Sequence, residues 1–225
     1  MIPILDNSER ARRVVLFFWV LLGTYVLLIF SSLLLLTVGV ENVEDNGRSA
    51  VVAMQFGLAY FLVFGVYLAV VITYIQWFRR AYHNLKKAGH QLEMSEGWAA
   101  GSWFVPFANL VMPYRIMKEI WYKTQVEFTE TPRHHGIVRI WWLAFIGGNI
   151  ASQVLSKIAD DDDLNQAALF AIISCVFHIT GILLAIRVVK RVTLFEELFR
   201  QQLQIETVGV AQPIAKDNDA EEEFY

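Results

Sequence analysis

Two uncharged apolar runs, residues 14–40 and 49–78, constrain the fold of this chain more than any other feature. At about 1.5 Å per helical residue they extend roughly 40 and 45 Å, whereas the hydrocarbon core of a bilayer is about 30 Å thick. The composition agrees, because 56% of the residues are hydrophobic and only 18% are charged. The sequence therefore predicts a polytopic membrane protein.

Three further uncharged runs follow, at residues 97–114, 140–156 and 164–186. Of the 19 Lys and Arg residues, 17 fall before the first run, after the second, between the third and fourth, or after the fifth. Since an excess of Lys and Arg marks the cytoplasmic side, these segments and both termini are predicted to be cytoplasmic. The acidic loops 41–48 and 157–163 are predicted to be external.

The run at 97–114 then has cytoplasmic segments on both sides, which a single crossing cannot produce. Pro106 and Pro113 interrupt it, and proline removes a helical hydrogen bond. The alternative is a fifth, proline-kinked span that would place residues 115–139 outside. We predict an all-α membrane helix bundle with a proline-broken re-entrant or interfacial segment at about 97–114 and four transmembrane spans, at about 14–40, 50–78, 137–156 and 164–186.

We expect one transmembrane helical domain over residues 1–205 and a disordered acidic tail over residues 206–225. Small residues form rows on three spans, which lets neighbouring helices approach closely. We interpret these rows as packing faces inside the bundle, and the alternative is a homodimer seam. The rows are Ala53, Gly57, Gly65 and Ala69; Ala144, Gly147, Gly148, Ala151 and Ser152; and Ala167, Ala171, Gly181 and Ala185.

An amphipathic stripe follows the fifth apolar run and comprises Val188, Val192, Phe195, Phe199 and Leu203. It predicts a helix that leaves the bilayer and pairs with another membrane-protein subunit. The expected partners are therefore the lipid bilayer and such subunits, with no nucleic acid.

The stretch from residue 80 to residue 121 contains RAYHNL, Gly97-Trp98, WFVPFANL at 103–110, Pro113-Tyr114 and Glu119-Ile120-Trp121. This combination resembles the bacterial membrane-protein family catalogued as domain of unknown function 4328. The resemblance implies a bacterial integral membrane protein with two spans before this segment and two after it, and it transfers no catalytic residue. It makes the proline-broken segment the family hallmark, with candidate motif residues Trp103, Pro106, Asn109, Pro113, Tyr114 and Trp121.

His178 is the one ionisable side chain deep within a predicted span, and Asn149 lies at a similar depth in the preceding span. Ionisable residues in a membrane interior are functional candidates, for instance in proton transfer. The alternative is a structural histidine that hydrogen-bonds Asn149, Gln153 or a serine hydroxyl.

No residue is assigned to catalysis, to a cofactor or to a metal. The acidic run at residues 160–163 indicates a solvated turn better than a cation site, because successive side chains in a short loop diverge. The histidines at 83, 90, 134 and 135 lack zinc-site spacing. Glu196 to Arg200 resembles a protease motif only superficially, because it lies outside the predicted bilayer.

These patterns favour a non-enzymatic protein of the bacterial cytoplasmic (inner) membrane that is an accessory or scaffold subunit of a membrane assembly. The alternative is a small transporter or channel in which Pro106, Asn109, Asn149 and His178 line a polar path, because broken helices commonly form such sites.

Overall fold

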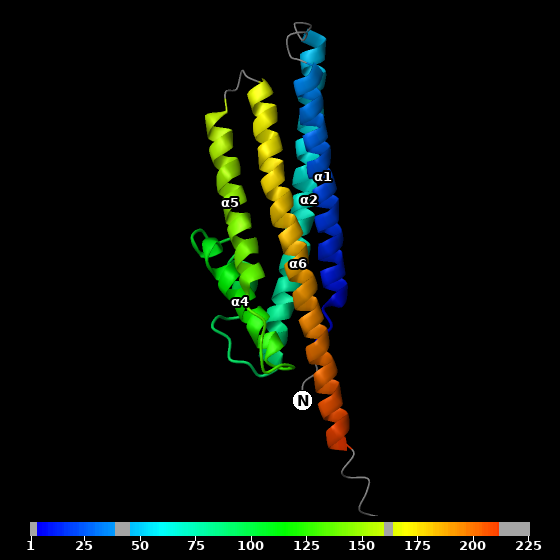
Figure 1. The fold of residues 1–225 in the computed structure, drawn as a ribbon, viewed down its shortest axis with the longest axis vertical. Coiled ribbons are helices and arrows are strands. Elements are labelled where there is room, and N and C mark those ends of the chain that lie inside the picture. The colour runs from blue at the N-terminus through cyan, green and yellow to red at the C-terminus, as the bar shows by residue number, and fades with distance from the viewer. Residues whose placement is uncertain (1–3, 39–45, 160–163, 212–225) are drawn as a thin grey trace, which may run out of the picture.

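The computed structural model describes residues 4–38, 46–159 and 164–211, and every regular element in these ranges is helical. Four long helices dominate the fold: α1 (Ser8–Val38), α2 (Asn46–Lys87), α5 (Gly136–Ile158) and α6 (Leu164–Ala211). They form two antiparallel pairs, α1 with α2 and α5 with α6, and α6 lies between α5 and α1 (Figure 1). The predicted all-α class is confirmed for the described residues.

Each long helix contains a stretch that is long and apolar enough to cross a membrane: Ser8–Thr37, Gly57–Lys87, Gly136–Ile158 and Asn165–Ile205. The predicted number and order of spans are therefore confirmed at the level of helices. The helices continue beyond the uncharged runs, since α2 extends to Lys87 and α6 to Ala211. The predicted tail boundary at residue 206 falls inside α6, and residues 212–225 lie outside the described residues, as do the acidic run at 160–163 and most of the loop at 41–48.

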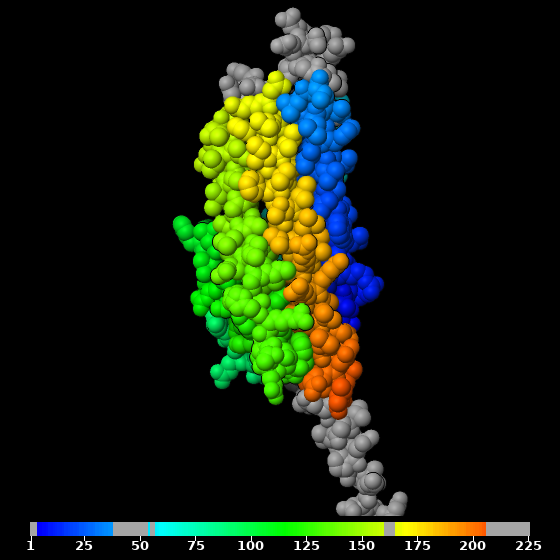
Figure 2. All heavy atoms as spheres, in the orientation of Figure 1, coloured from blue at the N-terminus to red at the C-terminus, as the bar shows by residue number. Residues whose placement is uncertain are grey.

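The run at 97–114 forms no fifth long helix. It contains α3 (Trp98–Gly101), the 3-10 helix η2 (Ala108–Leu110) and the beginning of α4 (Met112–Gln125). The end of α2 and the whole of α4 lie at the same end of the bundle, which we call the α4 end (Figure 1). The segment between α2 and α5 widens this half of the molecule in the space-filling view (Figure 2).

The hydrophobic core is concentrated at the α4 end. α4 packs on both α2 and α6 there. The most deeply buried apolar side chains of the described residues come from six elements, and they are Val14, Trp77, Phe78, Tyr82, Leu85, Ala99, Ile116, Met117, Ile120, Trp121, Val138, Val188, Val189 and Val192. Toward the opposite end α2 is open, and Leu58, Phe61 and Phe64 are 63%, 77% and 58% exposed. The α4 end is therefore the tightly assembled part of the molecule.

The rows of small residues make fewer close helix–helix contacts than the sequence predicts. A side-chain carbon at Gly148 would lie 3.5 Å from Phe177 Cβ, so α5 and α6 do approach closely there. At Gly57, Gly65 and Gly147 such a carbon would meet nothing within 4 Å. The interpretation as internal packing faces is therefore wrong for the described part of the α2 row, because α2 packs through a different face.

Candidate functional site at the α4 end of the bundle

Trp103, from the predicted family motif, lies at the centre of an aromatic cluster between α2 and α5. Its ring centroid is 5.4 Å from that of Tyr74 and 5.9 Å from that of Phe78 on α2. On α5 the corresponding distances are 6.0 Å to Trp142 and 6.2 Å to Phe145. All four pairs are edge-to-face, an arrangement that aromatic quadrupoles favour. Trp103 therefore joins two helices that are otherwise not closely paired.

The backbone turns sharply at Pro106. Its carbonyl accepts a hydrogen bond from the Ala108 N–H at 2.8 Å, which closes a three-residue turn around Phe107. Phe107 has φ 64° and ψ −38°, close to the strained γ-turn conformation. Its side chain is 84% exposed, and the Asn109 N–H donates to the Val105 carbonyl at 3.0 Å. Pro106 and Asn109 therefore shape a backbone turn that presents Phe107 outward.

Pro113 and Tyr114 begin α4. Pro113 lies in the first turn, where its missing N–H leaves no helical bond unmade, and its side chain is buried. The Tyr114 ring lies 6.4 Å from the His135 ring. Just before α4, the Leu110 carbonyl accepts a hydrogen bond from Trp142 Nε1 at 3.1 Å. The broken segment is thus fastened to the beginning of α5.

Trp121, the last motif residue, connects α4 to the loop after it and to α6. Its indole Nε1 donates to the Arg133 carbonyl at 2.8 Å, and its ring lies 5.0 Å from that of Phe195. The neighbouring Tyr122 hydroxyl lies 2.6 Å from His135 Nδ1. Of the eight predicted motif or site residues, those at 103–121 therefore gather at one end of the bundle.

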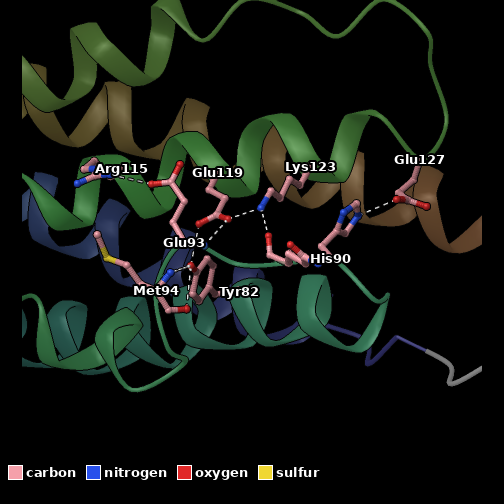
Figure 3. A network of polar contacts seen from close by, with 9 residues as sticks. Tyr82, His90, Glu93, Met94, Arg115, Glu119, Lys123 and Glu127 are labelled. Carbon is pink, nitrogen blue, oxygen red and sulfur yellow. Dashed lines mark hydrogen bonds and ion pairs between the residues drawn. The ribbon is translucent and has the colours of Figure 1, made fainter.

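Glu119 forms a buried polar network that the sequence did not single out (Figure 3). Its side chain is 5% exposed. One carboxylate oxygen accepts a hydrogen bond from the Tyr82 hydroxyl at 2.7 Å, and the other accepts the Glu93 N–H at 3.0 Å and a bond from Lys123. The Tyr82 oxygen in turn accepts the Met94 N–H at 3.2 Å. Glu119 thereby joins α2, the loop after it and α4.

Ion pairs extend this network along α4. Arg115 lies 2.9 Å from Glu93, and His90 Nε2 lies 2.7 Å from Glu127 (Figure 3). Lys123 also donates to the Gln91 carbonyl. The loop between α2 and α3 is therefore held along the length of α4.

A second buried carboxylate, Glu196 on α6, joins the segment before α1 to α2. Glu196 is 8% exposed, and it accepts hydrogen bonds from Asn7 Nδ2 at 3.0 Å and from Asn84 Nδ2 at 3.1 Å. Asn84 also binds both backbone groups of Leu5, and Asn7 Nδ2 lies 3.2 Å from the Trp77 carbonyl. Glu196 therefore fixes three parts of the chain that are far apart in sequence.

Burial raises the pKa of Glu196 from its ordinary value of 4.5 to about 7, against the opposing effect of the two asparagine bonds. Glu196 lies outside the predicted span at residues 164–186, because the uncharged run ends at Ile186 and basic residues follow. Arg200 pairs with Asp6 at 3.2 Å beside it. Hydrogen bonds from Ser8 are the main cause of the lowered pKa of Asp6. A cavity of about 20 Å³ adjoins these groups.

His178 and Asn149, the predicted residues of the membrane interior, do not contact each other through a hydrogen bond. His178 Nε2 lies 3.1 Å from Ser152 Oγ, and its ring stacks on Tyr25 with centroids 5.2 Å apart. Asn149 Nδ2 donates to the Phe145 carbonyl of its own helix at 2.7 Å. The hydrogen bond of His178 thus goes to a serine hydroxyl, one of the structural alternatives considered above.

A cavity of about 120 Å³ lies among α1, α2, α5 and α6, and Trp103 closes part of it. His178 lines this cavity, whereas Pro106, Asn109 and Asn149 do not. The four residues of the hypothetical polar path therefore do not meet in this cavity.

Tyr82, Asn84, Glu119 and Glu196 all lie in segments quoted above, but no site role was predicted for them from the sequence. One signal was available for the two carboxylates, because Glu119 falls on the apolar row of α4 and Glu196 falls on that of α6. A lone acid on an otherwise apolar helical face indicates a buried and hydrogen-bonded carboxylate.

A family model described as "Domain of unknown function (DUF4328)" matches residues 41–194, which is more than half of the chain. The match includes Asn84, the 103–121 motif and Glu119, and it ends just before Glu196. Searches of curated proteins and of solved structures find no match.

Proposed function

Because the chain belongs to the family of domain of unknown function 4328, we propose that it is a non-enzymatic, multi-pass protein of the bacterial inner membrane that acts as an accessory or scaffold subunit. The four helices that are apolar and long enough to cross a membrane support the multi-pass part of this proposal. The arrangement of the α4 end supports the scaffold part.

The observation that carries the scaffold role is the pair of buried carboxylates. Glu119 binds donors from α2, the following loop and α4, and Glu196 binds donors from the segment before α1 and from α2. A buried polar network whose members find partners fixes one arrangement of the elements around it. The α4 end is therefore a preassembled platform.

We place this platform on the cytoplasmic side, with the segment at 97–111 entering the membrane from there and returning. Support comes from its exposed apolar side chains, since Phe104, Phe107 and Leu110 are 70%, 84% and 49% exposed. Bilayer lipid would cover such side chains at no cost.

The orientation is tested with single cysteines in a Cys175→Ala background. Lys118→Cys and Lys157→Cys are both at exposed positions, on α4 and at the opposite end of α5. A membrane-impermeant maleimide applied to intact cells should label the variant at 157 and spare the one at 118. The reverse pattern contradicts the orientation.

The partner surface that we propose is the outer face of α6. Four of the five residues of the predicted stripe, Val188, Val192, Phe195 and Phe199, are buried within this chain at 1%, 0%, 4% and 2% exposure, and Leu203 is half-buried. This stripe therefore packs inside the chain and is not free for a partner. A different face of the same helix carries Leu194, Leu198 and Ile205, which follow the uncharged run. These three side chains are 55%, 37% and 67% exposed. These three residues follow coiled-coil spacing, and a helix of a second subunit could cover them.

Affinity purification from membranes in a mild detergent tests this surface. The wild type should retain a defined set of membrane proteins, and Leu194→Glu should lose it. Val126→Glu is the matched control, because Val126 is 52% exposed at the same end but on another element. Identical protein sets for both variants and the wild type would refute the α6 surface.

The transporter alternative has weaker support, because the cavity among the helices is mostly apolar and only His178 of the four path residues lines it. Solute flux into proteoliposomes that disappears in a well-folded His178→Gln variant would favour that alternative over a scaffold.

A further inference from the structure

Two of the side chains that line the cavity among the four long helices, Tyr74 and Trp103, carry a buried hydrogen-bond donor without an acceptor in the described residues. Tyr74 is 6% exposed, and its hydroxyl has no partner in the described part of the chain. The indole Nε1 of Trp103 is also buried and unpaired among these residues. Both side chains line the cavity, and their ring centroids are 5.4 Å apart. Because an unpaired buried donor is costly, this pair suits a ligand that supplies an acceptor oxygen.

Most of the remaining lining is apolar, and its other polar side chains are Tyr25, Tyr67 and His178. Phe18, Leu21, Phe145 and Ile182 contribute to the apolar part, and the lining includes no Lys, Arg, Asp or Glu side chain. The volume of about 120 Å³ is close to that of the engineered cavity of about 150 Å³ that admits benzene. A cavity of this kind accepts a hydrocarbon group and has no carboxylate, ammonium or guanidinium group to neutralise a charged one.

In the proposed membrane placement, the uncharged run of α2 is longer than the hydrocarbon core, so Tyr74 near its end lies at about the level of the phospholipid ester carbonyls. Tyr74 precedes Phe78, the last uncharged residue before Arg79, by one helical turn. At about 1.5 Å per residue, this turn places Tyr74 roughly 6 Å inside the end of the apolar run. The far side of the cavity, at Tyr25 and His178, lies deeper in the span.

The cavity is only partly enclosed, and α2 and α5 offer a lateral entrance. Close packing joins α1 to α2, α1 to α6 and α5 to α6, whereas α2 and α5 are not closely paired. On α2 the lining residue Tyr67 is 41% exposed. A chain in the surrounding lipid can therefore reach the cavity between these two helices.

We propose that this cavity binds the segment of one phospholipid acyl chain that lies next to the ester carbonyl. The Tyr74 hydroxyl and Trp103 Nε1 donate hydrogen bonds to the ester carbonyl, and the chain extends between α2 and α5 toward Tyr25 and His178. Trp103 gives the proline-broken segment a role in this site, because it closes the cavity at the α4 end and supplies one of the donors.

The test uses the full chain in proteoliposomes that contain phosphatidylglycerol with a photoreactive diazirine near the ester end of one acyl chain. After illumination, mass spectrometry of peptides should locate the lipid adduct on cavity residues such as Phe145 and Ile182. Gly181→Leu should reduce these adducts at least fivefold, because Gly181 lines the cavity and has open space where the new side chain would grow.

Gly65→Leu is the matched control. Gly65 also has open space around it, lies on a long apolar helix and does not line the cavity. Its adduct yield at the cavity should equal that of the wild type. Equal labelling in Gly181→Leu and Gly65→Leu would overturn the proposal, as would the absence of cavity adducts in the wild type.

Tyr74→Phe tests the polar half of the site without changing its shape. Loss of one hydrogen bond should lower cavity labelling roughly two- to tenfold. Unchanged labelling would overturn the assignment of the carbonyl to Tyr74. A diazirine fatty acid provides the second arm, and cavity labelling by the free acid with none by the phospholipid would overturn the choice of a phospholipid.

Discussion

Glu196 should make the stability of this protein depend on pH. The pKa of Glu196 is about 7 in the folded chain and 4.5 ordinarily. Between these two pH values the carboxyl group is therefore protonated in the folded state and ionised in the unfolded state. Below about pH 4.5 both states are protonated, and the stabilisation from the raised pKa is fully present. It is lost progressively as the pH rises to about 7, and stability is level above that pH.

The size of this effect follows from the shift. About 2.5 pKa units at 1.36 kcal/mol each give roughly 3 kcal/mol of unfolding free energy between pH 4.5 and pH 7 and above. Because Glu196 is 8% exposed, solvent screening reduces this figure little. For a chain of 225 residues it corresponds to a difference of roughly 6 to 12 °C in melting temperature.

The assay is thermal unfolding of the purified protein in detergent at pH 5, 6, 7 and 8, followed by intrinsic fluorescence. Glu196→Gln cannot titrate, so its melting temperature should fall less between pH 5 and pH 8 than that of the wild type. Glu197→Gln is the control, because the Glu197 side chain is 40% exposed on the same helix. A Glu196→Gln variant with the full pH dependence of the wild type would refute the reasoning.

Three other variants test the packing and the networks. Gly148→Leu should lower the unfolding free energy by about 1–3 kcal/mol because Phe177 lies against this position, whereas Gly147→Leu, with open space around it, should change the melting temperature little. Tyr82→Phe should cost about 1–3 kcal/mol in denaturant unfolding, because it removes a donor to buried Glu119, and an unchanged midpoint would argue against that network. His178→Gln retains a hydrogen-bonding group and should leave both thermal stability and growth near wild type, so a folded but inactive variant would contradict a structural role.

The four long helices were predictable because each depends on a local property of the sequence. An uncharged run longer than a bilayer is thick leaves few alternatives to a helix, since unpaired backbone groups are costly in lipid. The helix interruption at Pro106 was also predictable from the local sequence, because proline removes a helical hydrogen bond. The continuation of α6 was indicated by the apolar stripe at 188–203, although the helix extends further, to Ala211. The extension of α2 to Lys87 was not predicted, because packing against α1 and α4 stabilises this part.

The polar networks could not be predicted from local sequence patterns. Asn84 and Glu196 are separated by 112 residues, and the sequence around either residue does not indicate that the other is its hydrogen-bond partner. Which face of α2 packs was also not predictable, because the row of Gly57 and Gly65 and the row of Val70 and Tyr74 both satisfy helical spacing. Tertiary contacts with α1 select the second row.

The bond between Asn7 and Glu196 also sets an order of assembly during synthesis. The two residues are 189 positions apart, and a ribosome that adds about 5 to 20 residues per second needs roughly 10 to 40 seconds to proceed from one to the other. During that interval α1 and α2 can form and pair, but Asn7 and Asn84 still lack their common acceptor. The platform at the α4 end is therefore completed last, and a nascent chain that stalls before Glu196 emerges would have its first helices formed and this end still open.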